Sequence, residues 1–277
     1  MEHQNHPEDL AFDNRGSRKV LNLYHQSLHE LPAAVWEAAQ LEVLNLGDND
    51  LSDLPEVLGN LRNLRMLDLG HNHFRAIPGS IGKPTKLRFL YLSDNGFTAV
   101  PQTIGKLKEL RYLNLTDNEL TQLPEEVGRL TQLVELRLYN NRLEALPHSI
   151  GNLKRLRELH LMHNRLKTLP SSIGKLKTLG KLILENNQIE SLPASIGEME
   201  NLTDLDLRFN RLGRLPDSLG RLKHLRFLDL RANCLEVLPE SLSSLRKLEK
   251  LDLRWNRFEA LPAWIGRLEK RGCIVYS

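Results

Sequence analysis

The sequence is poor in cysteine and in aromatic residues. It has two cysteines, Cys234 and Cys273, in 277 residues, and aromatic side chains make up 5% of the chain. Small secreted domains that depend on disulfides carry many more cysteines. The two cysteines also fall two units apart in the repeat described below, about 10 Å by strand spacing, which is too far for a disulfide. We therefore expect both thiols to be free.

Long apolar runs and a strong excess of one charge are also missing. No stretch of about 18 apolar residues is available to span a membrane, and the polar start of the chain lacks the apolar segment of a secretory signal peptide. The formal net charge is only +3, whereas dedicated nucleic-acid binders have a stronger basic bias. These features predict a cytoplasmic protein with no nucleic-acid partner and no stable membrane insertion.

The motifs of common enzyme classes are absent as well. The sequence holds no G-x-S-x-G, no P-loop, no H-E-x-x-H and no protein-kinase motif set. Neither cysteine has a concave-surface histidine and an acid beside it in the repeat register. We therefore expect no catalytic residues, no cofactor and no metal, and we predict that the chain is not an enzyme.

What the sequence does contain is a strict repeat of 23 residues. An asparagine recurs at this interval through most of the chain, and a proline keeps the same interval from Pro32 to Pro262. A fixed interval in this range is typical of stacked repeat arrays rather than of one conventional globular core. The asparagines, called the asparagine ladder below, are Asn49, Asn72, Asn95, Asn118, Asn141, Asn164, Asn187, Asn210, Asn233 and Asn256.

One unit shows the pattern clearly. It has paired leucines, Leu113 and Leu115, followed by Asn118 and Leu120, and it matches L-x-x-L-x-L-x-x-N-x-L. The second half of the unit reads L-P-x-x-I-G-x-L. This pattern resembles the leucine-rich repeat family over residues 18–270. Its second half is similar to the intracellular Ras-group and Ras-suppressor type and to many bacterial chains. The resemblance implies a protein-recognition module without catalytic activity.

The predicted fold is an α/β horseshoe solenoid of about eleven repeats. A parallel sheet forms the concave side, and short 3₁₀ or α turns form the convex side. Leucines two positions apart on a short strand point to the same buried face. An asparagine amide both donates and accepts, so it satisfies backbone groups of the turn that follows each strand. We expect a monomer with an extended concave surface.

The two ends of the array are expected to be capped, because terminal repeats must cover the open core. At the N-terminus, Leu10 and Phe12 are predicted to cover the first repeat. At the C-terminus, Ile274 and Tyr276 are predicted to occupy the two leucine positions of a last strand. The three segments are residues 1–17 (tail and cap), 18–270 (solenoid) and 271–277 (truncated strand cap).

The first candidate site is an arginine row near the C-terminus. Three successive units repeat Leu-Asp-Leu-Arg, so that one acid and one arginine lie on the same face of each strand. One interpretation is a surface salt-bridge lattice, which contributes little per pair. The other is a row that binds an acidic or phosphorylated partner, because arginine grips such groups bidentately. The arginines are Arg208, Arg231 and Arg254, and they are flanked by the aromatic residues Phe209 and Trp255, a composition typical of binding hot spots.

The second candidate site is a group of large apolar side chains in the middle repeats. They fall at strand positions that face away from the core, where contiguous exposed apolar area tends to mark interaction sites. The alternative is that they only pack on each other across neighbouring strands. The candidate partner-binding residues of this group are Phe89, Tyr91, Tyr112, Tyr139 and Met162.

Two further patterns leave a structural and a functional interpretation open. The position before each ladder asparagine holds His25, Asp48 and His71 in the first units, which are residue types that bind zinc. They are also common in turns. Basic pairs on the convex edge, among them Arg246 with Lys247, are either a solvated face or a contact for an anionic surface.

The sequence thus predicts a non-catalytic scaffold that binds a protein partner on its concave surface, plausible for intracellular signalling by the family resemblance. A bacterial effector that binds a host protein is the alternative, since it would use the same surface. A binder of anionic or phosphorylated ligands through the arginine row is a third hypothesis.

Overall fold

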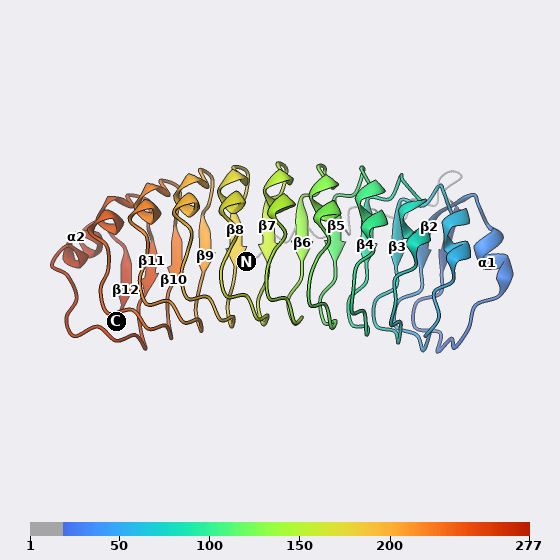
Figure 1. Cartoon of the computed structure of the whole chain (residues 1–277), viewed down its shortest axis with the longest axis horizontal. Helices are drawn as coiled ribbons and strands as arrows, with labels where there is room; N and C mark the ends of the chain where they lie inside the picture. The colour runs from blue at the N-terminus through green and yellow to red at the C-terminus, as the bar shows by residue number, and fades with distance from the viewer. Residues whose placement is uncertain (1–18) are drawn as a thin grey trace.

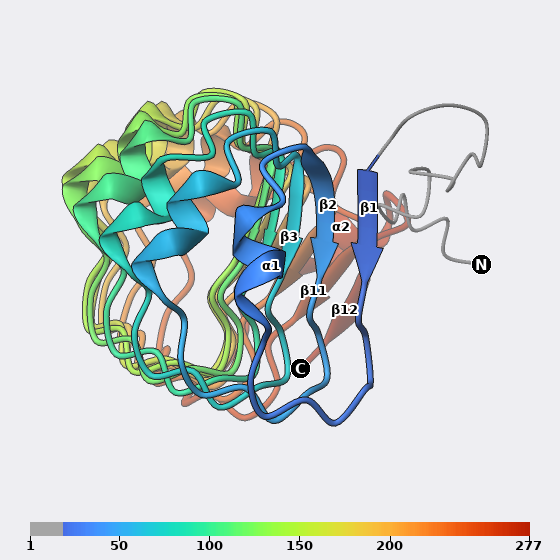
Figure 2. The same ribbon diagram turned by 90° about the vertical axis from the view of Figure 1, so that its right-hand side faces the viewer.

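The computed structural model describes residues 19–277 as a single curved stack (Figure 1). The predicted N-terminal cap, with Leu10 and Phe12, lies outside the described residues. Twelve parallel strands form one sheet in which each strand pairs with its neighbours in sequence. Viewed along the stack, the sheet lies on one side and the helical turns on the other (Figure 2). The predicted horseshoe solenoid is therefore confirmed.

The strands are short and nearly uniform. They are β1 (Lys19–Asn22), β2 (Leu41–Asn45), β3 (Met66–Asp68), β4 (Phe89–Tyr91), β5 (Tyr112–Asn114), β6 (Glu135–Arg137), β7 (Glu158–His160), β8 (Lys181–Ile183), β9 (Asp204–Asp206), β10 (Phe227–Asp229), β11 (Lys250–Asp252) and β12 (Ile274–Tyr276).

The convex segments are single helical turns, mostly of the 3₁₀ type. They are α1 (Ala33–Glu37), η2 (Glu56–Asn60), η3 (Gly79–Gly82), η4 (Gln102–Lys106), η5 (Glu125–Arg129), η6 (His148–Asn152), η7 (Ser171–Lys175), η8 (Ala194–Glu198), η9 (Asp217–Arg221), η10 (Glu240–Ser244) and α2 (Ile265–Glu269). A proline precedes each 3₁₀ turn in an extended conformation, as at Pro170 before η7, where its missing N–H costs no hydrogen bond.

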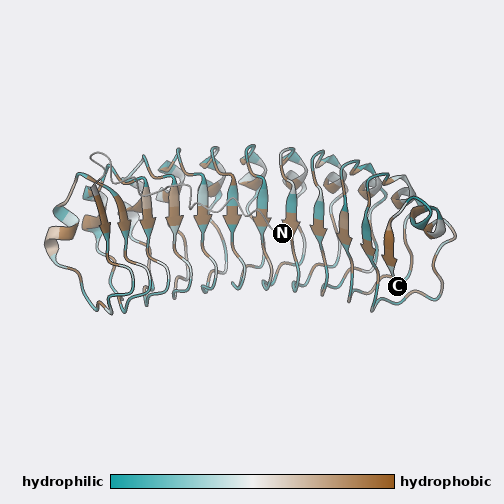
Figure 3. Cartoon of the chain, turned by 180° about the vertical axis from the view of Figure 1, so that it is seen from behind, coloured by the Kyte–Doolittle hydropathy of each residue, from teal (hydrophilic) through white to brown (hydrophobic). Residues whose placement is uncertain are grey.

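The core runs the whole length of the stack. From β2 to β11 the paired strand leucines, such as Leu113 and Leu115, are buried against the same leucines of the next repeat, whereas Leu21 and Leu23 of the first repeat are partly buried. Figure 3 shows apolar residues recurring on the strands, several of which also carry polar residues. Each repeat contacts mainly its neighbours, so stability comes from the interfaces between repeats.

The asparagine ladder satisfies the backbone where the chain turns behind each strand. The Nδ2 of Asn164 donates to the carbonyl oxygens of Leu138, Leu161 and Met162 at 2.9, 3.1 and 3.2 Å. Its Oδ1 accepts the N–H of Leu143 at 2.9 Å. One amide thus links two repeats. The same contacts recur at the other ladder positions, from Asn49 to Asn256.

The glycine of each convex turn is required by close packing between repeats. A Cβ placed on Gly174 would lie 2.3 Å from the carbonyl oxygen of Ser195 in the next repeat. Non-bonded atoms do not approach so closely without a backbone shift. This explains why the glycine recurs in the pattern. Its replacement by Ser243 falls in the last 3₁₀ turn, η10.

The C-terminal strand departs from the expectation. Val275, not Ile274 or Tyr276, pairs with the core leucine Leu251. Ile274 and Tyr276 are 57% and 40% exposed on the two alternate positions. The prediction that they fill the leucine positions was wrong, because the segment through α2 holds one residue more than the equivalent segment of the other repeats and shifts the strand by one residue.

The cysteines and the membrane-spanning potential of the helices are the last features of the fold. Cys234 and Cys273 are both free. Within residues 19–277, no helix has the length and apolar character that crossing a membrane requires.

Candidate recognition surface

The concave face carries three columns of side chains, because every second strand residue points away from the core. Neighbours within a column come from adjacent repeats, as in Met66, Phe89 and Tyr112, which pair directly in the sheet. The columns bring together the residues that the sequence analysis grouped. They form an apolar group over β3 to β7 and a charged group over β8 to β12.

The apolar group is packed more tightly than expected. The rings of Tyr91 and Tyr112 are 5.0 Å apart between centroids, and the guanidinium of Arg137 lies 5.6 Å from the centroid of the Tyr112 ring. Tyr112 is only 8% exposed, so the expectation of an exposed ring is wrong at this position. Phe89 and Met162 are half-buried. Packing across strands therefore accounts for much of this group.

Burial also fixes the charge state of these tyrosines. It raises the pKa of Tyr112 to about 12 and raises the pKa of Tyr91 still further above its usual range, with Tyr112 and Asp68 contributing. Both phenols remain neutral across the physiological range. This part of the face offers aromatic surface and hydroxyl donors rather than charge.

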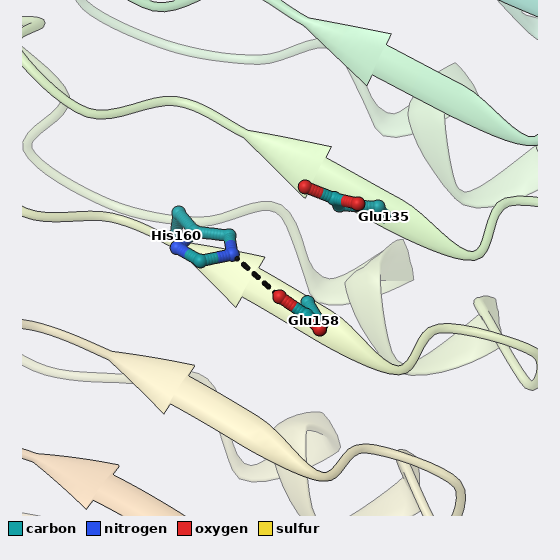
Figure 4. A group of neighbouring side chains, drawn as sticks. All are labelled: Glu135, Glu158 and His160. Carbon is teal, nitrogen blue, oxygen red and sulfur yellow. Dashed lines mark hydrogen bonds and ion pairs between the residues drawn. The ribbon is translucent and has the colours of Figure 1, made fainter. Parts of the chain in front are cut away.

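Below the tyrosines, β6 and β7 hold a group that combines two carboxylates with a histidine. Ligand-capable atoms of Glu135, Glu158 and His160 lie within 4.8 Å of one another, and the Nε2 of His160 is 3.1 Å from Glu158 (Figure 4). Among residues 19–277 this is where a metal ion would find three ligands.

The cations around this group already balance its charge. Arg137 Nε donates to Glu135 at 2.5 Å, and Lys181 Nζ lies 3.4 Å from Glu158. The hydrogen bond from His160 is the main reason that the pKa of Glu158 falls to about 2. Two carboxylates facing two cations need no metal for neutrality, so we interpret this group as an ion-pair network.

The position before each ladder asparagine is a turn position in the structure. Its residues have left-handed backbone angles, with φ near 55°, a region that asparagine, aspartate and histidine tolerate best among residues with a side chain. Where histidine occurs, its ring contacts the next repeat, as in His71 Nδ1 to Asp94 Oδ2 at 2.7 Å. The turn interpretation therefore explains the alternating histidines and acids of the sequence.

Phe209 and Trp255 occupy this same left-handed position, with φ values of 55° and 61°. Burial of the rings does not offset the cost of this backbone conformation, because the two residues are 44% and 64% exposed. Their ring centroids are 6.3 Å apart, and the repeat between them has the small Ala232 at this position. The sequence analysis named both residues because they stand next to an arginine, but it missed their backbone conformation. The signal was available, because both residues directly precede a ladder asparagine, the position that the sequence analysis recognised as a turn.

The arginine row is paired with carboxylates. Arg208 contacts Glu185 at 2.6 Å and Asp206 at 3.1 Å. Arg231 binds Asp229 at 2.6 Å. The salt-bridge lattice, one of the two interpretations of the arginine row, is thus present. An anionic ligand would have to compete with these acids for the guanidinium groups.

Arg254 differs from the other two arginines. It also pairs with an acid, Asp252, at 2.7 Å, but its guanidinium lies 5.7 Å from the Trp255 ring centroid and 5.0 Å from that of Tyr276. It joins the arginine row to the exposed aromatic residues at the end of the sheet.

A shallow hollow of about 190 Å³ opens on the concave face between β9, β10 and β11. Its polar lining comes from Asp204, Asp206, Asp229 and Lys250, and the ring of Phe227 forms an apolar wall. Such a hollow fits a single side chain of a partner rather than a small-molecule substrate, since ligand pockets are usually larger and more enclosed.

Asp206 provides a pH-dependent prediction. Burial raises the pKa of Asp206 to about 6. The negative charges of Asp229 and Glu185 raise this pKa further, whereas the contacts with Arg208 lower it. The folded state therefore holds this proton between about pH 4 and pH 6, where the unfolded chain has lost it, so stability falls as pH rises through this window. Asp206→Asn is expected to increase the free energy of unfolding by about 2 kcal/mol at pH 8.

The measurement is urea unfolding of Asp206→Asn and the parent chain at pH 4 and pH 8. The gain should be present at pH 8 and small at pH 4, where the aspartate is protonated in the folded state. An equal effect at both pH values would mean that ionisation of Asp206 does not destabilise the fold.

Comparison with known proteins agrees with this architecture. A family model described as a leucine-rich repeat region matches residues 79–168 and 148–223. A second, described as a leucine rich repeat, matches residues 17–74 and 200–258. No curated protein sequence matches the chain.

Three solved structures illustrate the similarity. A leucine-rich repeat protein of Leptospira interrogans is 33% identical with a TM-score of 0.77, over 94% of this chain and 72% of that one. The ectodomain of the plant membrane receptor kinase GASSHO1/SCHENGEN3 from Arabidopsis thaliana, solved with CASPARIAN STRIP INTEGRITY FACTOR 2, is 28% identical with a TM-score of 0.61, over 89% of this chain and 37% of that one.

The functional domain of InlJ from Listeria monocytogenes is 23% identical with a TM-score of 0.78, over 94% of this chain and 53% of that one. At this identity the match concerns the fold alone. The chain belongs to the leucine-rich repeat family, as shown by the repeat pattern with its asparagine ladder, the family-model matches and the similarity to the Leptospira structure.

Proposed function

We propose that this chain is a non-catalytic recognition module that binds a protein partner through the C-terminal part of its concave face. The anchors are Phe209 and Trp255, supported by Arg254 and by the hollow beside Phe227. The observation that carries the proposal is the placement of two large, exposed aromatic residues at left-handed backbone positions.

The energetic argument is that these two residues cost stability where they stand. A bulky side chain at positive φ is an outlier, and such strain amounts to about 1–3 kcal/mol. Other repeats use Asn140 or Asn186 at the same position with nearly the same φ. Phenylalanine and tryptophan are therefore unfavourable choices for the fold, but aromatic residues next to arginine supply binding energy.

The arrangement also suits a protein more than a small molecule. The aromatic pair, Arg254 and the hollow lie along several neighbouring strands of an open, curved face, which matches the extended binding surface of a solenoid. A partner would bury the rings of Phe209 and Trp255 and would place one side chain in the hollow. The half-buried residues Tyr139 and Met162 extend this face toward the middle repeats.

The cellular setting is part of the same proposal. The L-P-x-x-I-G-x-L half of the repeat, similar to Ras-group and Ras-suppressor chains, supports a scaffold in cytoplasmic signalling that acts as a monomer. A bacterial protein that binds a host protein is the second candidate, favoured by the 33% identity to the Leptospira interrogans chain. A secretion assay on residues 1–20 distinguishes the two, because only the second requires export.

Trp255→Asn tests whether the aromatic residue serves the fold. Because asparagine tolerates the left-handed region, the variant is expected to be more stable than the parent chain by about 1 kcal/mol. Thermal and urea unfolding measure the change. Val237→Ala is the control, since Val237 is exposed on a loop and its removal should change stability little. A clear loss of stability in Trp255→Asn would show that the ring has a structural role.

The function itself is tested by affinity capture with the purified chain from an extract of its source, followed by mass spectrometry. The parent chain and Val237→Ala should retain the same protein partner, and Phe209→Asn/Trp255→Asn should lose it. Equal capture by all three chains would rule out the proposed surface.

A further inference from the structure

We propose that a second binding site lies on the rim of the stack just before strands β10 to β12, and that it takes a soluble anion with clustered phosphate groups. The site is separate from the concave recognition surface and does not depend on the proposed function. Its central side chains are Lys223, Arg246, Lys247 and Arg271.

The site is built by the repeat register. The turn that leads from each helical segment to its strand holds a basic pair in three successive repeats, Lys223-His224, Arg246-Lys247 and Lys270-Arg271. Stacked parallel strands lie about 4.8 Å apart, so the three pairs follow one another at close range. Among the earlier repeats, Lys154-Arg155 is also a basic pair, but it stands alone: the repeats on either side of it have Thr131-Gln132 and Lys177-Thr178 in these positions.

Two adjoining hollows lie between these turns. One, of about 460 Å³, is lined by Arg226, Arg246, Lys247, Glu249 and Arg271 among others. The other, of about 500 Å³, is lined by Gly220, Lys223, Ser244, Arg246 and Lys247. Arg246 and Lys247 belong to both hollows and stand at their shared boundary. The cations thus surround a depression instead of covering a flat surface.

The central cations are free of carboxylate partners among residues 19–277. Arg226, by contrast, is held by Glu249 in a two-point contact at 2.7 and 3.0 Å, and the acid of this hollow is thereby neutralised. Arg271 donates to the backbone carbonyl oxygens of Ser243 and Arg267, which fixes its side chain without removing its charge.

Lysines at the same register elsewhere behave differently from Lys223. Lys108 and Lys154 donate to the carbonyl oxygens of Arg129 and Lys175 in the next repeat, and so they serve the stack. Lys223 makes no such contact in the described structure. Its ammonium group remains available to a ligand.

The charge is concentrated at this site. The four central side chains carry four positive charges, and none of them has a carboxylate partner among residues 19–277. Lys247 Nζ lies 3.4 Å from His224 Nδ1, so the histidine accepts from the ammonium when it is neutral. Grouped like charges repel one another, and an anion bound between them relieves this repulsion.

The chemistry of the lining favours phosphate groups. Guanidinium groups bind phosphate oxygens bidentately, and lysine adds a compact positive charge. The two hollows have no exposed aromatic ring among their lining residues, so they lack the stacking platform of single-strand nucleic-acid binders. They also lack the large apolar side chains that anchor a surface helix in a membrane. A compact polyphosphate-type anion fits these features best.

The probe is inorganic tripolyphosphate, titrated into the full chain by calorimetry at low salt, because electrostatic binding weakens as salt increases. The parent chain should bind it. Arg246→Glu/Lys247→Glu should bind at least about 30-fold more weakly, since each charge-assisted contact is worth about 1.5–3 kcal/mol. The milder Arg246→Gln/Lys247→Gln should give an intermediate loss.

The matched control is Lys106→Glu/Lys175→Glu, which makes the same change of net charge at exposed lysines of η4 and η7. The variants are also compared at about 0.1 M salt, where the Debye length is about 10 Å, and there this control should bind within about threefold of the parent chain. Equal losses in both double variants would overturn the site, since they would show a response to net charge alone. No binding to the parent chain would also overturn it.

A second arm separates the sources of phosphate. Phosphatidylcholine vesicles with and without an anionic phospholipid, and a short single-stranded RNA, are tested with the same variants. Binding of tripolyphosphate that depends on Arg246 and Lys247 supports the proposal. Binding of vesicles or RNA with this dependence, without binding of tripolyphosphate, would contradict it in favour of a membrane or nucleic-acid contact.

Discussion

Asn164→Ala is expected to lower the free energy of unfolding by about 4 kcal/mol. The amide donates to three carbonyl oxygens and accepts one N–H, and it does so inside the stack between two repeats. A buried polar group left unpaired costs about 1–3 kcal/mol, and alanine leaves more than one such group. Urea unfolding followed by circular dichroism measures the loss.

Two further variants separate this effect from a general effect of substitution. Asn152→Ala removes an asparagine at the exposed end of η6 and should change stability by less than about 0.5 kcal/mol. Asn164→Asp keeps the shape but directs a carboxylate at carbonyl oxygens, so it should be at least as destabilising as alanine. If Asn164→Ala unfolded like Asn152→Ala, the ladder would not hold the repeats together.

Gly174→Ala is expected to destabilise the stack by at least about 3 kcal/mol. Its Cβ would lie 2.3 Å from the carbonyl oxygen of Ser195 and 2.8 Å from the Cβ of the same residue. The obstacle is mostly backbone, which cannot rotate away as a side-chain end would. The neighbouring repeat must move, and overpacking of this kind commonly costs about 1–3 kcal/mol or more.

The matched control is Gly213→Ala, because a Cβ at Gly213 would meet no atom within 4 Å. This change should leave the free energy of unfolding unchanged or raise it by up to about 1 kcal/mol, by reducing the freedom of the unfolded chain. Differential scanning calorimetry of the two variants is sufficient. Similar melting temperatures for both would mean that the repeats are more adaptable than the close contact implies.

The fold was predictable because each repeated residue has one local reason for its position. Asn118 must satisfy a buried turn, Pro124 must begin a helical turn, and Leu113 and Leu115 must face the core. Their recurrence at a constant interval is enough to set the register of the sheet. The free state of Cys234 follows from the same register.

The parts that could not be predicted depend on contacts between neighbouring columns. Tyr112 stands at an outward-facing position, but Tyr91 and Arg137 cover it. The final strand moves by one residue because the segment before it is longer by one, so Val275 replaces Ile274 and Tyr276 at the core. Neither event changes the repeat pattern itself.

The candidate surface was predictable only in outline. The Leu-Asp-Leu-Arg motif predicted that the acid and the arginine would share a face. It could not decide whether Arg208 and Arg231 pair with acids of the same chain or remain available to a partner. The structure shows these two arginines in internal ion pairs. The exposed aromatic residues beside Arg254 are therefore better candidates for partner contact than the arginine row.

The most direct test of the proposed surface is the affinity of the captured partner for Phe209→Asn/Trp255→Asn, measured alongside the stability of the same preparation. We expect the variant to be at least as stable as the parent chain and to bind at least about 30-fold more weakly, the size of a hot-spot loss. Unchanged affinity in a fully folded variant would contradict the account, because the two aromatic residues would then have no part in recognition.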